Sequence, residues 1–310
     1  MQEYQRYFYI ISYRVRSLGD SKTPVYFLVL SSVINIALDF ILIIYVKMGV
    51  AGAGVATVVS QFISGVGCTI YMYKKFDILK ATKQENVVRK RYVVNLCYIG
   101  VPMGLQYSIT AIGSTILQAA VNGLGSSYVA AMTAGSKMFN FTCCPFDALG
   151  STMATYGGQN VGAGKIDRLG KGIRAAMIIG TVYSVVALVV LFFTTDYIAL
   201  LFVDAAEVEI IRLTRRFIIA SALFYIPLTG VNVYRFCIQG MGYSVFAILA
   251  GVFEMLARTL VAIFLIPVIG FNGACLANPA AWIAADIFLI PAFMHCCNKL
   301  KIRHGMKKSA

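Results

Sequence analysis

Residues 175–195 read AAMIIGTVYSVVALVVLFFTT, a run of 21 residues without a charged side chain. A helix needs about 20 mainly apolar residues to cross the hydrocarbon core of a bilayer. Seven further stretches have this length and character: 25–46, 50–72, 93–117, 128–149, 217–238, 245–267 and 273–294. The sequence therefore predicts an all-α fold, a polytopic transmembrane bundle with eight spans in this chain.

The composition excludes an ordinary soluble domain. Hydrophobic residues make up 59% of the chain and charged residues only 13%, where about 25% is usual for a soluble protein. The lipid bilayer is the solvent in which so much apolar surface is stable.

The net charge of +14 would also suit a nucleic-acid partner, but its distribution argues against one. When successive connections between the spans are assigned to alternating sides of the membrane, 20 of the 27 Lys and Arg fall on one side and four on the other. The basic side contains the connections 13–24, 73–92, 157–174, 234–244 and the C-terminal tail. Positive connections face the cytoplasm. We therefore expect a multi-pass protein with a cytoplasmic C-terminus and no nucleic-acid partner.

Part of the sequence is repeated. Residues 49–61 (GVAGAGVATVVSQ) and 270–282 (GFNGACLANPAAW) share two Gly and two Ala at a constant offset of 221 residues. A span with a polar i, i+4 pair precedes each copy, Asn35 with Asp39 and Glu254 with Arg258. Both copies have the same orientation, which is a parallel repeat of the kind found in transporters.

The repeat predicts an N-terminal truncation. Four expected spans precede Gly242 in the second copy, whereas only residues 1–13 precede Gly19 in the first. We expect about three and a half helices to be absent, either lost or supplied as a separate chain.

Six short motifs, in order along the chain, resemble MATE (multidrug and toxic compound extrusion) transporters. They are RSLGDSKTP (16–24), GVAGA (49–53), GVPMGLQ (100–106), GGQN (157–160), QGMGYS (239–244) and Glu254 with Arg258 and Gly270. The resemblance covers essentially the whole chain.

The resemblance implies a MATE-like bundle with a complete C-lobe and the last part of the N-lobe. Residues 1–92 would end the N-lobe, 93–298 would form the C-lobe, and 299–310 a basic cytoplasmic tail. The family resemblance further implies export of organic cations or drugs across the cell membrane in exchange for Na⁺ or H⁺, without another cofactor.

Ionisable residues inside a membrane are costly and usually functional. The expected spans contain Asp39, Asp147, Glu254, Asp286, Lys137 and Arg258. Glu254 and Arg258 share a helix face and can form an ion pair. This pair is either a structural clamp or the place where Glu254 exchanges Arg258 for a coupling ion. We take Asp39 and Asp147 as further ion-coupling candidates.

Cavity candidates come from two helix faces. Gln106, Thr110, Ser114, Gln118 and Asn122 lie on one strip with a spacing of four, which serves either interhelical hydrogen bonds or a polar cavity. Lys137, Asn140 and Asp147 share a face of the next span. Lys137 either repels a cationic substrate or pairs with a carboxylate such as Glu254.

Three alternatives to drug efflux stay open. A lipid-linked oligosaccharide flippase of the same superfamily would need several cations around its cavity, and only Lys137 and Arg258 are expected at membrane depth. A membrane enzyme would need a cluster of catalytic residues, and the sequence offers none. The truncated chain would otherwise be a non-transporting remnant, inactive or incomplete by itself.

Overall fold

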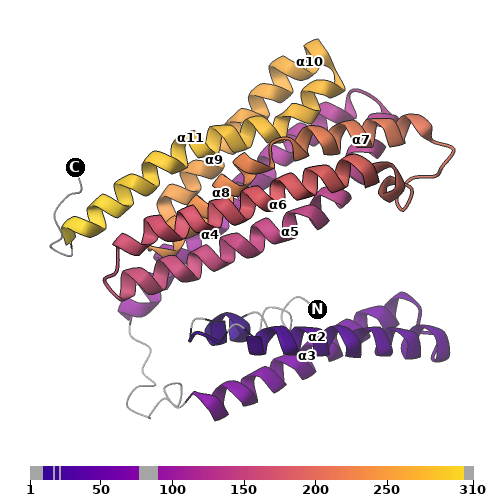
Figure 1. Ribbon diagram of the computed structural model, residues 1–310. Helices are drawn as coiled ribbons and strands as arrows, with labels where there is room; N and C mark the ends of the chain where they lie inside the picture. Colours follow the sequence, from indigo (N-terminus) through magenta and orange to yellow (C-terminus); the bar gives the residue numbers. More distant parts are fainter. Residues whose placement is uncertain (1–9, 17, 21, 77–89, 304–310) are drawn as a thin grey trace. The chain divides into compact units, whose positions relative to one another are not determined.

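Every regular element in residues 10–16, 18–20, 22–76 and 90–303, the part that the computed structural model describes, is helical. The chain forms two compact units, Met1–Arg89 and Lys90–Ala310 (Figure 1). The expected all-α bundle is confirmed. Some of the expected features lie outside the described residues. They are parts of the N-terminal segment 1–13, of the connection 73–92 and of the tail, at residues 1–9, 77–89 and 304–310.

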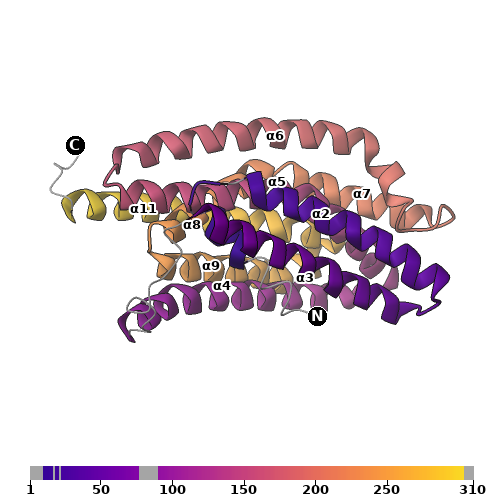
Figure 2. The same cartoon turned by 90° about the horizontal axis from the view of Figure 1, so that it is seen from below.

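The first unit is built on a helical hairpin. Helix α2 (Lys22–Asp39) continues into the π-helical segment η1 (Phe40–Tyr45). After a turn, α3 (Val50–Lys75) runs beside it (Figures 1 and 2).

Asp20 ties the two helices of this hairpin together. Its carboxylate accepts hydrogen bonds from the Thr23 backbone N–H (3.1 Å), the Thr23 hydroxyl (2.9 Å), the Tyr71 hydroxyl (2.9 Å) and the Lys75 ammonium (2.8 Å). The Lys75 ammonium, with the Thr23 N–H, holds the pKa of Asp20 well below its usual range. The motif that contains Asp20 thus joins the start of α2 to the end of α3.

The second unit consists of α4 (Lys90–Asn122), α5 (Ser126–Gly162), α6 (Asp167–Ala199), α7 (Val208–Ala222), α8 (Tyr225–Gly240), α9 (Ser244–Leu260), η3 (Val261–Leu265), α10 (Ile266–Ile269) and α11 (Phe271–Arg303). Figure 2 shows α4 and α6 at opposite sides of this unit, with α8 between them. Helix α8 packs on α5, α6, α9 and α11, so its side chains face protein on most sides.

The surface of α6 explains why this bundle needs lipid. Its exposed residues from Ile178 to Phe193 are almost all Ile, Val or Phe, and 16 helical residues cover about 24 Å. Its inner face is a row of mostly small residues, including Ala176, Gly180 and Ser184. An apolar outer face of this length fits the hydrocarbon layer, and the protein is a multi-pass membrane protein.

The expected spans match the helices with two qualifications. Five helices of the described chain are long and apolar enough to cross a membrane, and a sixth candidate is α7 with α8. The sequence predicts one continuous helix over 217–238. This prediction is wrong, because α7 and α8 meet there at a bend of 53°. Helices α4 and α5 cover 93–117 and 128–149, but they are not among these candidate spans.

The connections are shorter than expected, because several helices extend beyond their apolar stretches. Only residues 163–166 join α5 to α6, and the motif 157–160 lies in the last turns of α5. Arg235, expected in a basic connection, is a buried residue of α8.

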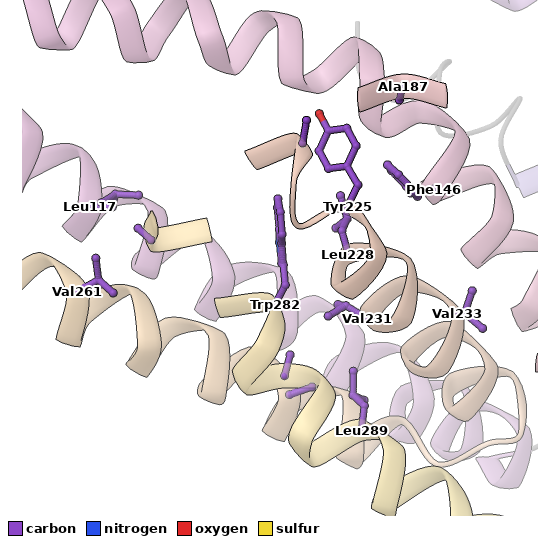
Figure 3. Close-up of a cluster of buried hydrophobic side chains, with 14 of the residues drawn as sticks. Leu117, Phe146, Ala187, Tyr225, Leu228, Val231, Val233, Val261, Trp282 and Leu289 are labelled. Carbon is purple, nitrogen blue, oxygen red and sulfur yellow. The ribbon is translucent and has the colours of Figure 1, made fainter. Parts of the chain in front are cut away.

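The core of the second unit is aromatic at its centre. Phe146 of α5 and Tyr225 of α8 have ring centroids 5.3 Å apart, and both are almost fully buried. Figure 3 shows Tyr225, Leu228 and Val231 of α8 beside Trp282 of α11.

The internal repeat is present in the backbone. The π-helical segments begin at Phe40 and Val261, which are 221 residues apart. Gly49 (φ 56°, ψ −135°) and Gly270 (φ 58°, ψ −136°) have the same conformation, which only glycine adopts readily. Their carbonyls accept from Gly52 (3.1 Å) and Gly273 (2.9 Å). Both units therefore contain the same kind of hairpin, as the sequence predicts.

We expect Asp20→Ala to loosen the hairpin of the first unit, because it removes the acceptor shared by α2 and α3. Loss of a helix-capping side chain alone costs about 1 kcal/mol. Hydrogen–deuterium exchange of peptides within 22–76 should accelerate severalfold at neutral pH.

The same contacts should give this effect a pH dependence. The folded state lowers the pKa of Asp20, so the stabilisation is complete above about pH 4 and is lost as the pH falls further. The difference between wild type and variant should shrink there. Asp167→Ala, at an exposed carboxylate of α6, is the control; equal exchange in all three proteins would contradict the role of Asp20.

Candidate functional site

The second unit contains a buried charge cluster centred on Glu254. Arg258, one turn along α9, donates from Nη2 to Glu254 Oε2 at 3.3 Å. Arg235 of α8 donates from Nη2 to Oε1 of the same carboxylate. The three side chains are at most 10% exposed. The ion pair expected from the sequence is present, and a second arginine completes it.

Arg235 is the main residue that the sequence analysis missed. The predicted topology places Arg235 in the basic connection 234–244. A usable signal was its spacing, because Asn232, Arg235 and Gln239 fall on one face of a helix. All three are buried, which identifies this face of α8 as polar.

The cluster borders a polar cavity of about 230 Å³. Side chains of α5, α8, α9 and α11 line it, and they are Phe139, Asn140, Cys143, Asp147, Leu228, Val231, Asn232, Arg235, Glu254, Arg258, Asn278 and Trp282. Four of the ten residues predicted as site candidates lie here: Asn140, Asp147, Glu254 and Arg258. The sequence therefore identified part of the lining from α5 and α9, but not the parts from α8 and α11.

Helix α11 contributes an amide and an aromatic wall. Asn278 Oδ1 accepts a hydrogen bond from Arg258 Nε at 3.3 Å. One turn on, Trp282 stacks on Phe139 of α5, with ring centroids 5.7 Å apart and planes inclined by 12°. The cavity thus combines charged groups with a flat apolar wall, as small-molecule sites commonly do.

Asp147 differs from Glu254 in its surroundings. It lies on α5 at the cavity, and within the described ranges it forms no ion pair. An unpaired carboxylate beside a cavity suits a cationic group.

Asp286 of α11 lies against α8 where Gly230 has no side chain. A methyl group at Gly230 would come within 2.6 Å of Asp286 Oδ2. Asp286 Oδ1 is buried, without a hydrogen-bond partner among the described residues.

Of the four site candidates on the polar strip of α4, Gln106 forms a hydrogen bond to another helix of the described chain. Gln106 accepts a hydrogen bond from Gln239 of α8 at 2.6 Å, and both side chains are buried. Gln118 donates to Asn122 on its own helix at 3.0 Å. The Thr110 hydroxyl is buried and has no partner in the described part of the chain. None of these four residues lines the cavity of about 230 Å³.

Lys137 and Asp39 lie away from the charge cluster. The Lys137 ammonium is 5.6 Å from the ring centroid of Phe202, and the structure gives no ion pair between Lys137 and Glu254 over the described residues. Asp39 ends α2 in the first unit, where its Oδ1 is buried without a partner among the residues that are described. No group of three His, Cys, Asp or Glu side chains in the described chain is arranged to hold a metal ion.

Sequence comparison identifies relatives of this chain. The family model MatE matches residues 102–264, more than half of the chain. A "Probable multidrug resistance protein YoeA" from Bacillus subtilis (strain 168) is 25% identical over 250 residues, covering 78% of this chain and 53% of that protein. A "FAD transporter" from Shewanella oneidensis is 23% identical and covers 71% and 51%. The chain thus spans about half the length of the curated relatives it matches.

Solved structures share the fold. The structure described as "Crystal structure of MATE in complex with MaL6" superposes with a TM-score of 0.87 at 18% identity, over 96% of this chain and 67% of the other. The structure described as "Outward-facing conformation of a multidrug resistance MATE family transporter of the MOP superfamily" gives 0.86 at 18% identity, over 93% and 65%.

Gly230→Ala should destabilise the contact between α8 and α11, because the added methyl group meets the Asp286 carboxylate. Overpacking of this kind typically costs about 1–3 kcal/mol. The measurement is the unfolding midpoint of the purified chain in detergent.

Gly170→Ala in α6 is the matched control, since nothing lies within 4 Å of the added methyl group and alanine favours a helix. A midpoint for Gly230→Ala equal to or above that of Gly170→Ala would contradict the close approach.

Proposed function

The chain belongs to the MATE family, and from this premise we propose that it forms part of a secondary active transporter that exports drug-like molecules. The names of the multidrug-resistance relatives support this activity. The observation that carries the proposal is the cavity in the second unit, with its buried charges and aromatic wall. Such a cavity binds small molecules inside a bilayer, where isolated charges are otherwise excluded.

We propose organic cations as substrates and Asp147 as the group that meets them. Asp147 lines the cavity and lacks an ion-pair partner over the described ranges. Trp282 and Phe139 offer the flat apolar surface that an amphipathic cation needs.

We propose that Glu254 couples transport to Na⁺ or H⁺. Its two oxygens are bound by different arginines, so an ion or proton that reaches the carboxylate must weaken at least one of these contacts. Such an exchange changes the contact between α8 and α9, and it therefore links ion binding to helix movement. Asp39 is a second coupling candidate, in the first unit.

We also propose the membrane arrangement that follows from the charges. Residues 1–92 end one lobe, residues 93–298 form the other, and the basic tail 299–310 lies in the cytoplasm of a cell whose plasma membrane holds the protein. The predicted topology places most Lys and Arg on one side of the membrane, and this supports the orientation because basic connections usually face the cytoplasm.

The flippase alternative gains one cation from Arg235 but is less well supported. A pyrophosphate would need free cations, whereas Arg235 and Arg258 both bind Glu254, and the cavity has a volume of only about 230 Å³. A lipid-linked oligosaccharide is larger than this volume. Export of small molecules is therefore the better proposal.

Drug resistance tests the activity. Because the chain spans about half of its relatives, it is joined behind the N-terminal helices of the Bacillus subtilis relative and expressed in a drug-sensitive bacterium. Ethidium and fluoroquinolone resistance should rise above the vector control, and transport in vesicles with imposed Na⁺ or H⁺ gradients should respond to one of them. Resistance equal to the vector control would refute export.

In the same fusion, Glu254→Gln should reduce ion-driven transport about tenfold, because the amide has no charge to exchange. Loss of one hydrogen bond to a charged group costs about 1.5 kcal/mol, which corresponds to roughly tenfold in rate. Gln106→Ala is the comparison, since Gln106 lies outside the cavity and bonds only within the bundle. Normal transport by Glu254→Gln, with equal protein in the membrane, would exclude the coupling role.

A further inference from the structure

The turn before α9 repeats the backbone of the turn before α2. Gly19 (φ 93°) and Gly242 (φ 89°) both have a positive φ. The N–H of each glycine donates to the carbonyl three residues earlier, at 3.0 and 2.9 Å. The N–H groups of the residues that follow, Asp20 and Tyr243, donate to the carbonyl five residues earlier, at 3.3 and 3.1 Å. Tyr243 therefore occupies in the second unit the position of Asp20 in the first.

The exchange of Asp20 for Tyr243 removes a carboxylate from this position. Asp20 binds the Lys75 ammonium at the end of α3 (2.8 Å) and accepts from the Thr23 backbone N–H at the start of α2 (3.1 Å). Tyr243 makes no side-chain capping bond to α9. The ammonium of Lys299, near the end of α11, lies 5.7 Å from the centroid of its ring. The second unit thus keeps the cation and the helix N-terminus but lacks the anion that joins them.

A cavity of about 520 Å³ lies at this turn. The turn 241–243 and side chains of α11 that include Lys299 and Arg303 line it, and none of the described residues in its lining is acidic. Lys299 and Arg303 are four residues apart and share a helix face. Neither forms an ion pair within the ranges that the structure describes, and Asp167 binds Lys301 instead, at 3.3 Å. Two cations therefore face this cavity without a carboxylate partner.

The cavity lies at the depth of lipid headgroups. The apolar stretch of α11 ends at residue 294, so Lys299 is about 8 Å and Arg303 about 14 Å further along the helix. The headgroup layer is about 5–8 Å thick on each side of the hydrocarbon core. Side chains of a helix point toward its N-terminus, which for both cations is back toward the membrane. Phosphates of anionic lipids lie at the same level and attract such basic groups.

We propose that this cavity binds the phosphate of an anionic phospholipid, which replaces the carboxylate that Asp20 provides in the first unit. Lys299 and Arg303 bind the phosphate oxygens, the dipole of α9 favours an anion at its N-terminus, and the acyl chains continue into the hydrocarbon layer. The bound lipid joins the start of α9 to the end of α11. This site lies outside the proposed transport cavity and needs no transport. In the proposed orientation, the lipid comes from the cytoplasmic leaflet.

Lipid retention by the purified full chain tests this proposal. The chain is released from detergent micelles that contain one added probe, and native mass spectrometry counts the molecules that stay bound. Phosphatidylglycerol has a net negative charge. Phosphatidylcholine with the same acyl chains has the same phosphate but is neutral overall, and glycerol phosphate has the phosphate without acyl chains.

For the wild-type chain we expect about tenfold more bound phosphatidylglycerol than phosphatidylcholine, the gain from one charge-assisted hydrogen bond. Glycerol phosphate should bind more weakly than phosphatidylglycerol, because it has no apolar chains to bury.

Two sets of variants locate the lipid. Lys299→Gln combined with Arg303→Gln should lower the retention of phosphatidylglycerol to that of phosphatidylcholine. Lys171→Gln combined with Arg174→Gln, at exposed residues of α6, removes the same charge elsewhere and should leave retention unchanged. Tyr243→Asp should reduce retention about tenfold with both cations in place, because it restores the internal carboxylate. Tyr243→Asn is its neutral control and should retain the lipid.

The wild-type comparison decides the proposal even where a variant fails to fold. Equal retention of phosphatidylglycerol and phosphatidylcholine would overturn it. An equal loss of lipid in the α6 double variant would also overturn it, because net charge alone would then explain retention. Glycerol phosphate bound as tightly as phosphatidylglycerol would identify a site for soluble phosphates and refute the lipid. Loss of lipid in Tyr243→Asp but not in Tyr243→Asn supports the replacement of the missing carboxylate.

Discussion

A buried, charged carboxylate inside a bilayer is costly unless cations pair with it, and Glu254 in the second unit has two such partners. Arg235 and Arg258 bind the two oxygens of Glu254. Removing one partner from such a cluster leaves a buried charge, which is far more costly than leaving out the whole cluster. The contacts fix how α8 lies against α9, and the bond from Arg258 to Asn278 extends this restraint to α11.

The internal repeat shows how the two units differ in the polar contacts of their hairpins. The hairpins share a π-helical segment and a glycine turn at the same spacing. In the first unit, Asn35 contacts Thr57 across the hairpin at 3.4 Å. Asn278, 221 residues after Thr57, instead bonds a charged Arg258. The same backbone frame thus holds a neutral contact in one unit and a charged cluster in the other.

Much of the fold could be predicted, because bilayer thickness and hydropathy determine where helices cross. The apolar run 175–195 lies within α6, and the repeat predicted from short motifs recurs in the backbone angles of Gly49 and Gly270. Mean hydropathy over 217–238 does not reveal the bend between α7 and α8, although Pro227 in the first turn of α8 is a signal of a new helix start.

The site was harder to predict than the fold. Glu254 and Arg258 were accessible because a pair four residues apart on one helix must share a face. Arg235, Asn278 and Trp282 reach the cavity from other helices, and spacing along one helix gives no information on contacts between helices. For the same reason, the strip of Gln106 was compatible with both a cavity and a helix contact, and only the bond to Gln239 distinguishes them.

The central claim is that Glu254, Arg235 and Arg258 form a buried charge cluster. The most direct test is the stability of the full chain after one member or all three members of the cluster are replaced. Unfolding in mixed detergent is compared for Glu254→Leu alone and for Glu254→Leu combined with Arg235→Met and Arg258→Met. The single change should cost about 3–5 kcal/mol, because it leaves two buried guanidiniums without their carboxylate, and the triple change should recover most of that loss. A Glu254→Leu variant as stable as the wild type would show that the three side chains do not form a buried charge cluster.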